Sequence, residues 1–379
     1  MTTLSVFGAI LALGAFILHW RYVRATHLAR PWSYVADAVL VSMWALSLIG
    51  IGSGEVFDPD WARVPAFIGL TWLAVVMYLL LGTLVIGAVT LGIRLVMAAR
   101  RRESAPLRLR VTRAGSAVVA IGAVIAVGYG TVEATHPQVT ETTVVMDRLP
   151  SEFDGIRIAL VSDLHAGPSR GSDFVQSVVD QVNVQSPDLV VLDGDLTDGT
   201  VDLVGSDLAP LQRLSAPLGV FGVSGNHEFY AGDGGKWLDL WDSLGVTVLR
   251  NEHRTIDRAG ASIDVAGIND ATAPAPFEPN LAAALDGRDA ERFVLLLAHQ
   301  PLQVFEASKM GVDFQVSGHT HAGQIWPLRY LVPLQQPTVE GLDTIENTTV
   351  YTTRGAGTWG PPVRVAAPPE ISMLQLVSS

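Results

Sequence analysis

The chain contains 379 residues, of which 49% are hydrophobic and none is cysteine, and its formal net charge is −12 at pH 7. The absence of cysteine excludes disulfide bonds, thiolate nucleophiles and cysteine-ligated zinc sites. The charge is divided unevenly: residues 1–136 contain 11 arginines and six acidic residues, whereas residues 137–379 contain 14 basic and 31 acidic residues. The acidic second part should repel the phosphates of nucleic acids, so we expect no nucleic acid partner.

The first 132 residues are predicted to form a transmembrane region. Four runs have the length and the nearly uncharged, apolar composition that a membrane-spanning helix needs. The first of them has neither a basic segment before it nor a small-residue cleavage site, which indicates an anchor and not a removable signal peptide. The lipid bilayer is therefore an expected partner. The four runs cover residues 4–20, 35–52, 64–93 and 114–132.

The third run, with 30 residues, is long for one upright span and short for two spans with a turn. Charge in the connecting loops decides between these alternatives. Three arginines follow the first run and six lie at residues 100–113 after the third, whereas the loop between the second and third runs is acidic. Loops rich in arginine remain in the cytoplasm, and only four spans place both of these loops there. We therefore expect one long, tilted third helix and place the chain after residue 132 on the extracytoplasmic side of the cell membrane.

Residues 133–150 are predicted to be a polar linker and residues 151–379 an α/β domain, because short apolar strands alternate there with helical patterns. Polar side chains directly follow five of these strands. The segments after the strands read Ser-Asp-Leu-His, Asp-Gly-Asp, Gly-Asn-His-Glu, Ala-His-Gln and Gly-His-Thr-His. Ligand-binding side chains gather beyond the carboxyl ends of strands in α/β sheets. Five such motifs in one domain are hard to attribute to chance.

Seven side chains in these motifs are candidate metal ligands. Seven nitrogen and oxygen donors are too many for one tetrahedral zinc ion and suit two ions that share a carboxylate. Imidazole, carboxylate and amide donors favour Mn, Fe, Zn, Co or Ni over calcium. Two such ions can hold a bridging water as hydroxide and stabilise an in-line phosphoryl displacement. The candidate ligands are Asp163, His165, Asp195, Asn226, His299, His319 and His321.

His227 is the candidate general acid. It follows a candidate ligand without being one, which leaves its ring free to protonate a leaving group. We expect Glu228 or another nearby acid to set its tautomer.

In this order, the motifs DLH, GDLTD, GNHE, AHQP and GHTHAGQ resemble those of the calcineurin-like metallophosphoesterase superfamily. The match is best with its membrane-anchored bacterial branch, which includes lipid-precursor pyrophosphatases and cell-wall-associated phosphoesterases. The resemblance covers about residues 156–376 and implies a four-layer α-β-β-α sandwich, with a leaving-group or transition-state role for His227. It also implies two metal sites bridged by Asp195. One consists of Asp163, His165, Asp195 and His321, and the other of Asp195, Asn226, His299 and His319.

Two further segments have open interpretations. Residues 354–364 resemble the same branch, and Arg354 and Arg364 either line a phosphate pocket as substrate-binding residues or belong to a turn that caps the last strand. Residues 325–334 (IWPLRYLVPL) are apolar and interrupted by prolines. They form either a packed loop or an apolar lip beside the metals that faces the bilayer.

Together these patterns predict a membrane-anchored, dinuclear metal-dependent phosphoesterase of the phosphodiesterase or pyrophosphatase type. The short connection to the last span favours an amphiphilic substrate, such as a lipid-linked phosphate ester or pyrophosphate of the cell envelope. The alternative is a non-catalytic module that metals stabilise and that binds envelope polymers. The complete ligand set together with His227 favours the enzyme. We expect no obligate protein partner.

Overall fold

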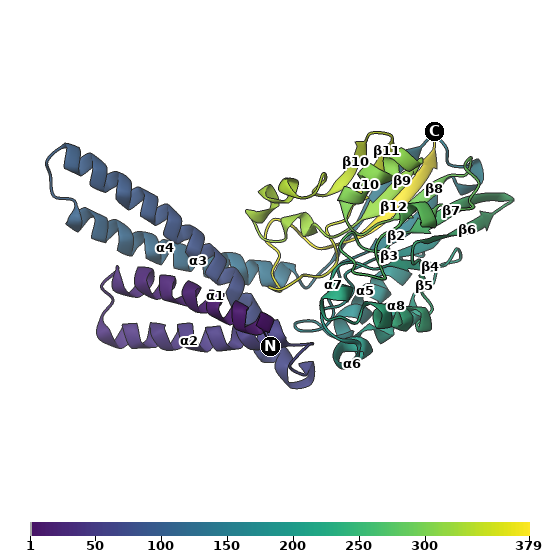
Figure 1. Ribbon diagram of the computed structural model, residues 1–379. Helices are drawn as coiled ribbons and strands as arrows, with labels where there is room; N and C mark the ends of the chain where they lie inside the picture. The colour runs from purple at the N-terminus through teal and green to yellow at the C-terminus, as the bar shows by residue number, and fades with distance from the viewer. Residues whose placement is uncertain (1) are drawn as a thin grey trace. The chain divides into compact units, whose positions relative to one another are not determined.

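The computed structural model describes residues 2–379, which divide into two compact units (Figure 1). The first unit holds the N-terminal helices. The second consists of Gly54–Pro59, Glu133–Trp359 and Arg364–Ser379.

Four long apolar helices make up most of the first unit. Each is long and apolar enough to cross a membrane, so all four predicted runs are helical. The third is one continuous helix of 41 residues, as expected, and at 1.5 Å per residue it is about 60 Å long. The helices are α1 (Thr2–Leu18, continued by a π-helical segment, His19–Arg24), α2 (Arg30–Gly52), α3 (Pro59–Ala99) and α4 (Ala105–Glu133).

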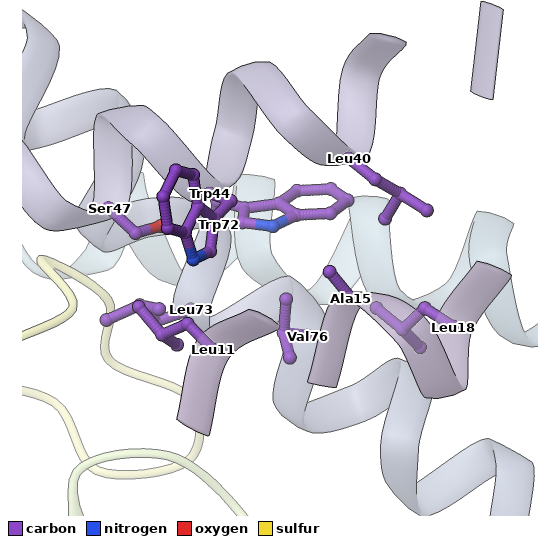
Figure 2. A pocket seen from close by; sticks show the side chains of 9 residues that line it. All are labelled: Leu11, Ala15, Leu18, Leu40, Trp44, Ser47, Trp72, Leu73 and Val76. Atoms are coloured by element: carbon purple, nitrogen blue, oxygen red, sulfur yellow. The ribbon is translucent and has the colours of Figure 1, made fainter. Parts of the chain in front are cut away.

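Small residues let these helices approach each other closely. The Ser47 hydroxyl of α2 donates a hydrogen bond of 2.9 Å to the carbonyl of Gly69 in α3, where a Cβ atom would overlap the α2 backbone. Figure 2 shows an apolar pocket beside this contact. Its volume is about 10 Å³, room for about one water molecule, so the helices are well packed here. The pocket is lined by Leu11, Ala15, Leu18, Leu40, Trp44, Ser47, Trp72, Leu73 and Val76.

Two six-stranded sheets form the centre of the second unit (Figure 1). The first sheet, in spatial order, contains β1 (Gln138–Met146), β12 (Glu370–Ser378), β2 (Ile156–Val161), β3 (Leu189–Asp193), β4 (Val220–Val223) and β5 (Thr247–Val248). The second contains β10 (Gly341–Ile345), β11 (Thr348–Thr352), β9 (Phe314–Ser317), β8 (Val294–Leu297), β7 (Ala261–Gly267) and β6 (Glu252–Arg258).

Alternating side chains of the strands produce four layers. Ile158 and Leu160 of β2 belong to the apolar core shared by both sheets. Ala159 and Val161 of the same strand pack instead with α5 and α8. A third cluster joins the second sheet to α9 and α10, so the predicted four-layer α-β-β-α sandwich is confirmed. The helices of this unit are α5 (Ser172–Val184), α6 (Val201–Val204), α7 (His227–Tyr230), α8 (Gly234–Ser243), α9 (Leu281–Ala284) and α10 (Val304–Ala307), with short 3-10 segments between elements.

The prediction of a linker over residues 133–150 is wrong for Gln138–Met146. These nine residues form β1, which pairs in parallel with β12 along its whole length. Val144 and Met146 are buried, whereas Thr143 and Val145 are exposed. Threonine and valine favour strands, but an edge strand with one wet face is as polar as a linker, so composition concealed it.

Candidate metal centre

The seven predicted ligands all follow the carboxyl ends of strands. Each strand is a short run that is buried except for the half-buried Arg157 in β2 and Val220 in β4. The chain leaves four of the five strands through a segment with glycine or serine, and leaves β8 through Ala-His-Gln-Pro. Asp163 and His165 follow β2, Asp195 follows β3, Asn226 follows β4, His299 follows β8, and His319 and His321 follow β9.

These side chains form two groups that meet at Asp195. In the first, ligand atoms of Asp163, His165 and His321 all lie within 4.8 Å of one another, and in the second those of Asp195, His299 and His319 do. We call Asp163, His165 and His321 site A. We call Asn226, His299 and His319 site B, with Asn226 included as the family resemblance implies. The peptide N–H of His227, the residue after Asn226, donates to Asp195 Oδ1 at 2.8 Å.

One carboxylate oxygen of Asp195 faces both sites. Its Oδ2 lies 3.9 Å from Nε2 of His165 in site A and 3.1 Å from Nε2 of His299 in site B. Within site A, Nε2 of His321 lies 3.1 Å from Nε2 of His165 and 3.2 Å from Asp163 Oδ1. This is the arrangement expected of a carboxylate shared by two ions.

A buried oxygen atom of site B indicates that the residues fit a metal ion. Asn226 Nδ2 donates to the Tyr230 hydroxyl at 2.7 Å, and His299 Nδ1 lies 2.6 Å from the carbonyl oxygen of Asp193. Asn226 Oδ1 has no hydrogen-bond partner in the described part of the chain, whereas His299 Nε2 lies 3.1 Å from the Asp195 carboxylate. A buried polar atom without a partner requires an explanation such as a bound ion.

Backbone strain concentrates in the same residues. Five of the seven ligands have positive φ angles, which are uncommon for residues other than glycine and collect at functional sites. Two neighbouring glycines are required by close approach, since a Cβ atom on Gly225 would overlap the Asp195 carboxylate and one on Gly318 would overlap that of Asp163. The five are Asp163 (58°), His165 (48°), Asp195 (51°), His319 (66°) and His321 (49°).

The local electrostatics keep two ligands in the protonation state that metals bind. Burial alone would raise the pKa of Asp195, but His299, His227 and His165 lower it well below its usual range, so the carboxylate is ionised. Burial lowers the pKa of His321 to about 3, so this imidazole is neutral at pH 7.

Asp198 contacts two residues of the candidate site and was not among the residues predicted from sequence. Its Oδ1 lies 3.0 Å from Nδ1 of His165 and 2.5 Å from Nδ1 of His227. It therefore fixes the orientation of one metal ligand and of the candidate general acid. The available signal was the second aspartate of GDLTD, three residues after Asp195 in the same turn.

Glu228 has a different part from the one we considered for it. Its carboxylate is fully buried and accepts the backbone N–H groups of Asp195, Leu196 and Gly225 at 2.7–3.0 Å. Glu228 thus holds the turn that presents Asp195, while Asp198 holds the ring of His227.

Arg354 and Arg364 are engaged with the protein. Arg354 pairs with Glu370 at 2.6 Å and with Glu340 at 3.3 Å, and its Nε donates to the carbonyl of Pro368. Arg364 is fully buried and donates to the carbonyls of residues 321, 354, 355, 357 and 367. Its Nη2 also lies 3.0 Å from Nδ1 of His321. These contacts do not support direct substrate binding by either arginine and favour the alternative, a turn against the last strand.

Comparison with known proteins, like the geometry of the site, points to a metal-dependent protein. The family model described as calcineurin-like phosphoesterase matches residues 156–323. A transmembrane protein with a metallophosphoesterase domain from Danio rerio is 35% identical over 330 residues, which cover 84% of this chain and 74% of that protein. The chain belongs to the calcineurin-like metallophosphoesterase family.

Bacterial relatives match this metallophosphoesterase over a shorter length. An uncharacterized metallophosphoesterase from Helicobacter pylori strain J99 is 39% identical over 246 residues, 64% of each chain. The metallophosphoesterase YkuE from Bacillus subtilis is 31% identical over 263 residues, 66% of this chain and 91% of YkuE. With its four apolar helices and the transmembrane relative, the protein is a membrane protein that carries a metal-dependent phosphoesterase domain.

Proposed function

We propose that this metallophosphoesterase uses two divalent metal ions to hydrolyse a phosphate ester or pyrophosphate bond, with His227 as general acid. The observation that supports this best is the position of Asp195 Oδ2, which faces His165 of site A and His299 of site B. When bound, two divalent ions supply an activated water and neutralise charge on the phosphoryl group. Site A together with Asp195 would hold one ion, and site B together with Asp195 the other.

His227 is well placed to donate a proton. Its side chain is 17% exposed, and because Nδ1 contacts Asp198, Nε2 is the atom that can face a substrate. Burial lowers the pKa of His227, but Asp195 and Asp198 raise it to about 10. In the metal-free protein His227 is therefore protonated at neutral pH, and a proton on Nε2 would be available to a leaving-group oxygen.

Hydrolysis of bis(p-nitrophenyl) phosphate by the purified full-length protein in detergent tests the proposal. We expect turnover with Mn²⁺ and its loss in EDTA. Absence of metal-dependent turnover, with metals bound, would support the non-catalytic envelope-binding module instead.

The role of His227 has its own test. A nitrophenolate departs without a proton, whereas an alkoxide needs one, and general acids contribute typically ~10²–10⁴-fold. At matched metal content, His227→Ala should lose much more kcat/KM on an alkyl phosphodiester than on the nitrophenyl ester. An equal loss on both substrates would assign His227 to charge stabilisation or positioning.

We also propose that the catalytic unit lies on the extracytoplasmic side. Support comes from the nine arginines at residues 21–30 and 100–113, which four spans place together on the cytoplasmic side. The cysteine-free chain permits a direct test with an impermeant thiol reagent. In intact cells, Ser379→Cys should be labelled and Ser104→Cys should not, and the reverse result would invert the orientation.

An amphiphilic, lipid-linked substrate is the class that we propose for the site. Helix α4 ends at Glu133 and β1 begins at Gln138, and five residue steps span at most about 18 Å. The phosphoesterase domain is thus tethered close to the lipid surface. We expect kcat/KM to be higher for a lipid-linked phosphate than for its head group alone, and equal values would contradict the proposal.

A further inference from the structure

The segment 325–334 carries an unusual concentration of exposed apolar side chains. Among the described residues of the second unit, twelve large apolar side chains are exposed, and four of them lie within nine consecutive residues of this segment. Single exposed apolar residues are ordinary, whereas clusters mark interaction surfaces. The four are Trp326 (50% exposed), Tyr330 (70%), Leu331 (57%) and Leu334 (79%).

The beginning of this segment is firmly attached to the rest of the domain. Ile325 is buried, and the N–H of Trp326 donates to the carbonyl of Val365 at 3.0 Å. Gly323, at the end of the site A ligand motif, packs so closely on the backbone of Arg329 that a Cβ atom would overlap it. The segment therefore starts directly beside site A.

Its far end is attached beside site B. Gln336 is buried, and its side chain contacts that of Gln300 at 3.1 Å, next to the ligand His299. The same side chain accepts the N–H of Leu302 at 3.0 Å. Residues 325–334 are thus an apolar projection with both ends fixed next to the metal centre, and we keep the name apolar lip for it.

The composition of the apolar lip suits a lipid surface. Its one charged residue, Arg329, pairs with Glu340 at 2.9 Å. Tryptophan and tyrosine are the side chains enriched at the membrane–water boundary. The surrounding domain is strongly acidic, so attraction to anionic lipid head groups does not account for binding, and apolar burial has to.

The membrane-spanning helices of the chain identify a lipid bilayer as the partner of the apolar lip. Four helices long and apolar enough to cross a membrane precede the domain, and four residues separate the last of them from β1. A bilayer is therefore always within reach of the domain, whereas a soluble partner would have to be recruited.

We propose that the apolar lip inserts Trp326, Tyr330, Leu331 and Leu334 into the head-group region of the bilayer. This interaction goes beyond the proposed hydrolysis and does not depend on it. It makes the lip a second, peripheral membrane contact of the protein, located beside sites A and B.

Collision accessibility of single spin labels tests this insertion in the full-length protein. Because the chain has no cysteine, Leu334→Cys and Tyr330→Cys each carry one label after reconstitution into phosphatidylcholine vesicles. Val184→Cys is the matched control, because Val184 on α5 is 78% exposed and Leu334 is 79% exposed. Relative to the control, labels in the lip should show several-fold lower collision with a water-soluble nickel complex and higher collision with oxygen. Unchanged metal content identifies folded variants, and either lip position suffices if the other variant does not fold.

Three results would overturn the proposal. Water-like accessibility of both lip labels would mean that the lip stays in solvent. Protection from both nickel and oxygen would mean that protein covers it, either a second copy of the chain or another partner. Lipid-like accessibility at Val184 as well would mean that insertion is not a property of the lip.

Discussion

The two halves of the metal centre are held in different ways. In site A, side chains contact two ring nitrogens in opposite ways: Asp198 lies beside Nδ1 of His165 and can accept its proton, whereas Arg364 donates to Nδ1 of His321. In site B, the corresponding partner of His299 is the backbone carbonyl of Asp193. Outer partners fix the orientation and basicity of metal ligands. Substitution of an outer side chain can therefore weaken metal binding at site A. The partner of His299 in site B is a backbone group at the end of β3, which no side-chain substitution removes.

Asp195 faces both sites, so its substitution should affect site A and site B alike. We expect this substitution to have the largest effect. Asp195→Asn preserves the shape of a side chain that contacts both sites but removes its charge. We expect metal content to fall at both sites and kcat/KM to fall by more than the roughly 10–100-fold that loss of an outer partner costs. Metal analysis of the purified protein provides the measurement. An Asp195→Asn protein with about two ions per chain and full activity would contradict the shared-carboxylate arrangement.

Asp198→Asn should weaken metal binding at site A and leave site B unchanged. It removes the acceptor beside His165 and His227 but touches none of the site B ligands. We expect one ion to be held more weakly and kcat/KM to fall by about 10–100-fold. Asp202→Asn, an exposed carboxylate four residues later, is the control and should behave as the unmodified protein. Equal weakening of both ions would show that Asp198 supports the whole centre and not site A.

The features that could be predicted from sequence are those that depend on residues close together in the chain. All seven candidate ligands follow strands within a few residues, so strand ends and motif order were sufficient to predict that their side chains gather in one place. The four-layer fold followed from the resemblance that these motifs carry. The bridging position of Asp195 came from the same resemblance and stays a prediction; in the structure its Oδ2 lies near His165 and His299.

The features that were not predicted from sequence depend on partners that are distant in the chain. Strand β1 is defined by β12, more than 200 residues later, and its own polarity resembles a linker. The structural role of Arg364 comes from the carbonyl groups that surround its side chain in the folded turn, and its neighbours in sequence do not indicate it. The two contacts of Asp198 exist only because β2, β3 and β4 end side by side.

Substitution of Arg364 should show that the support of site A is also structural. Arg364→Met leaves several buried carbonyls without a donor, and each costs about 1–3 kcal/mol before relaxation. The control, Arg250→Met, removes exposed ion pairs with Asp239 and Asp242, worth about 0–1 kcal/mol each. In thermal unfolding of the metal-free protein, Arg364→Met should therefore lower Tm by several times more than the control. Equal shifts would remove the structural role.

The smallest expected effect concerns His227 in the metal-free protein. Burial lowers its pKa, but Asp195 and Asp198 raise it to about 10, above the value of about 6.5 in an unfolded chain. A raised pKa contributes stability that is complete below about pH 6.5, declines above it and is lost as the pH passes about 10. The Tm difference between the unmodified protein and His227→Gln should therefore shrink steadily from pH 6.5 to pH 10. Loading both proteins with metal should flatten this dependence, because cations beside Asp195 compete with the imidazolium. A difference that stays constant with pH in the metal-free protein would show that the contact between His227 and Asp198 carries no net charge, and that the support of site A does not extend to the general acid.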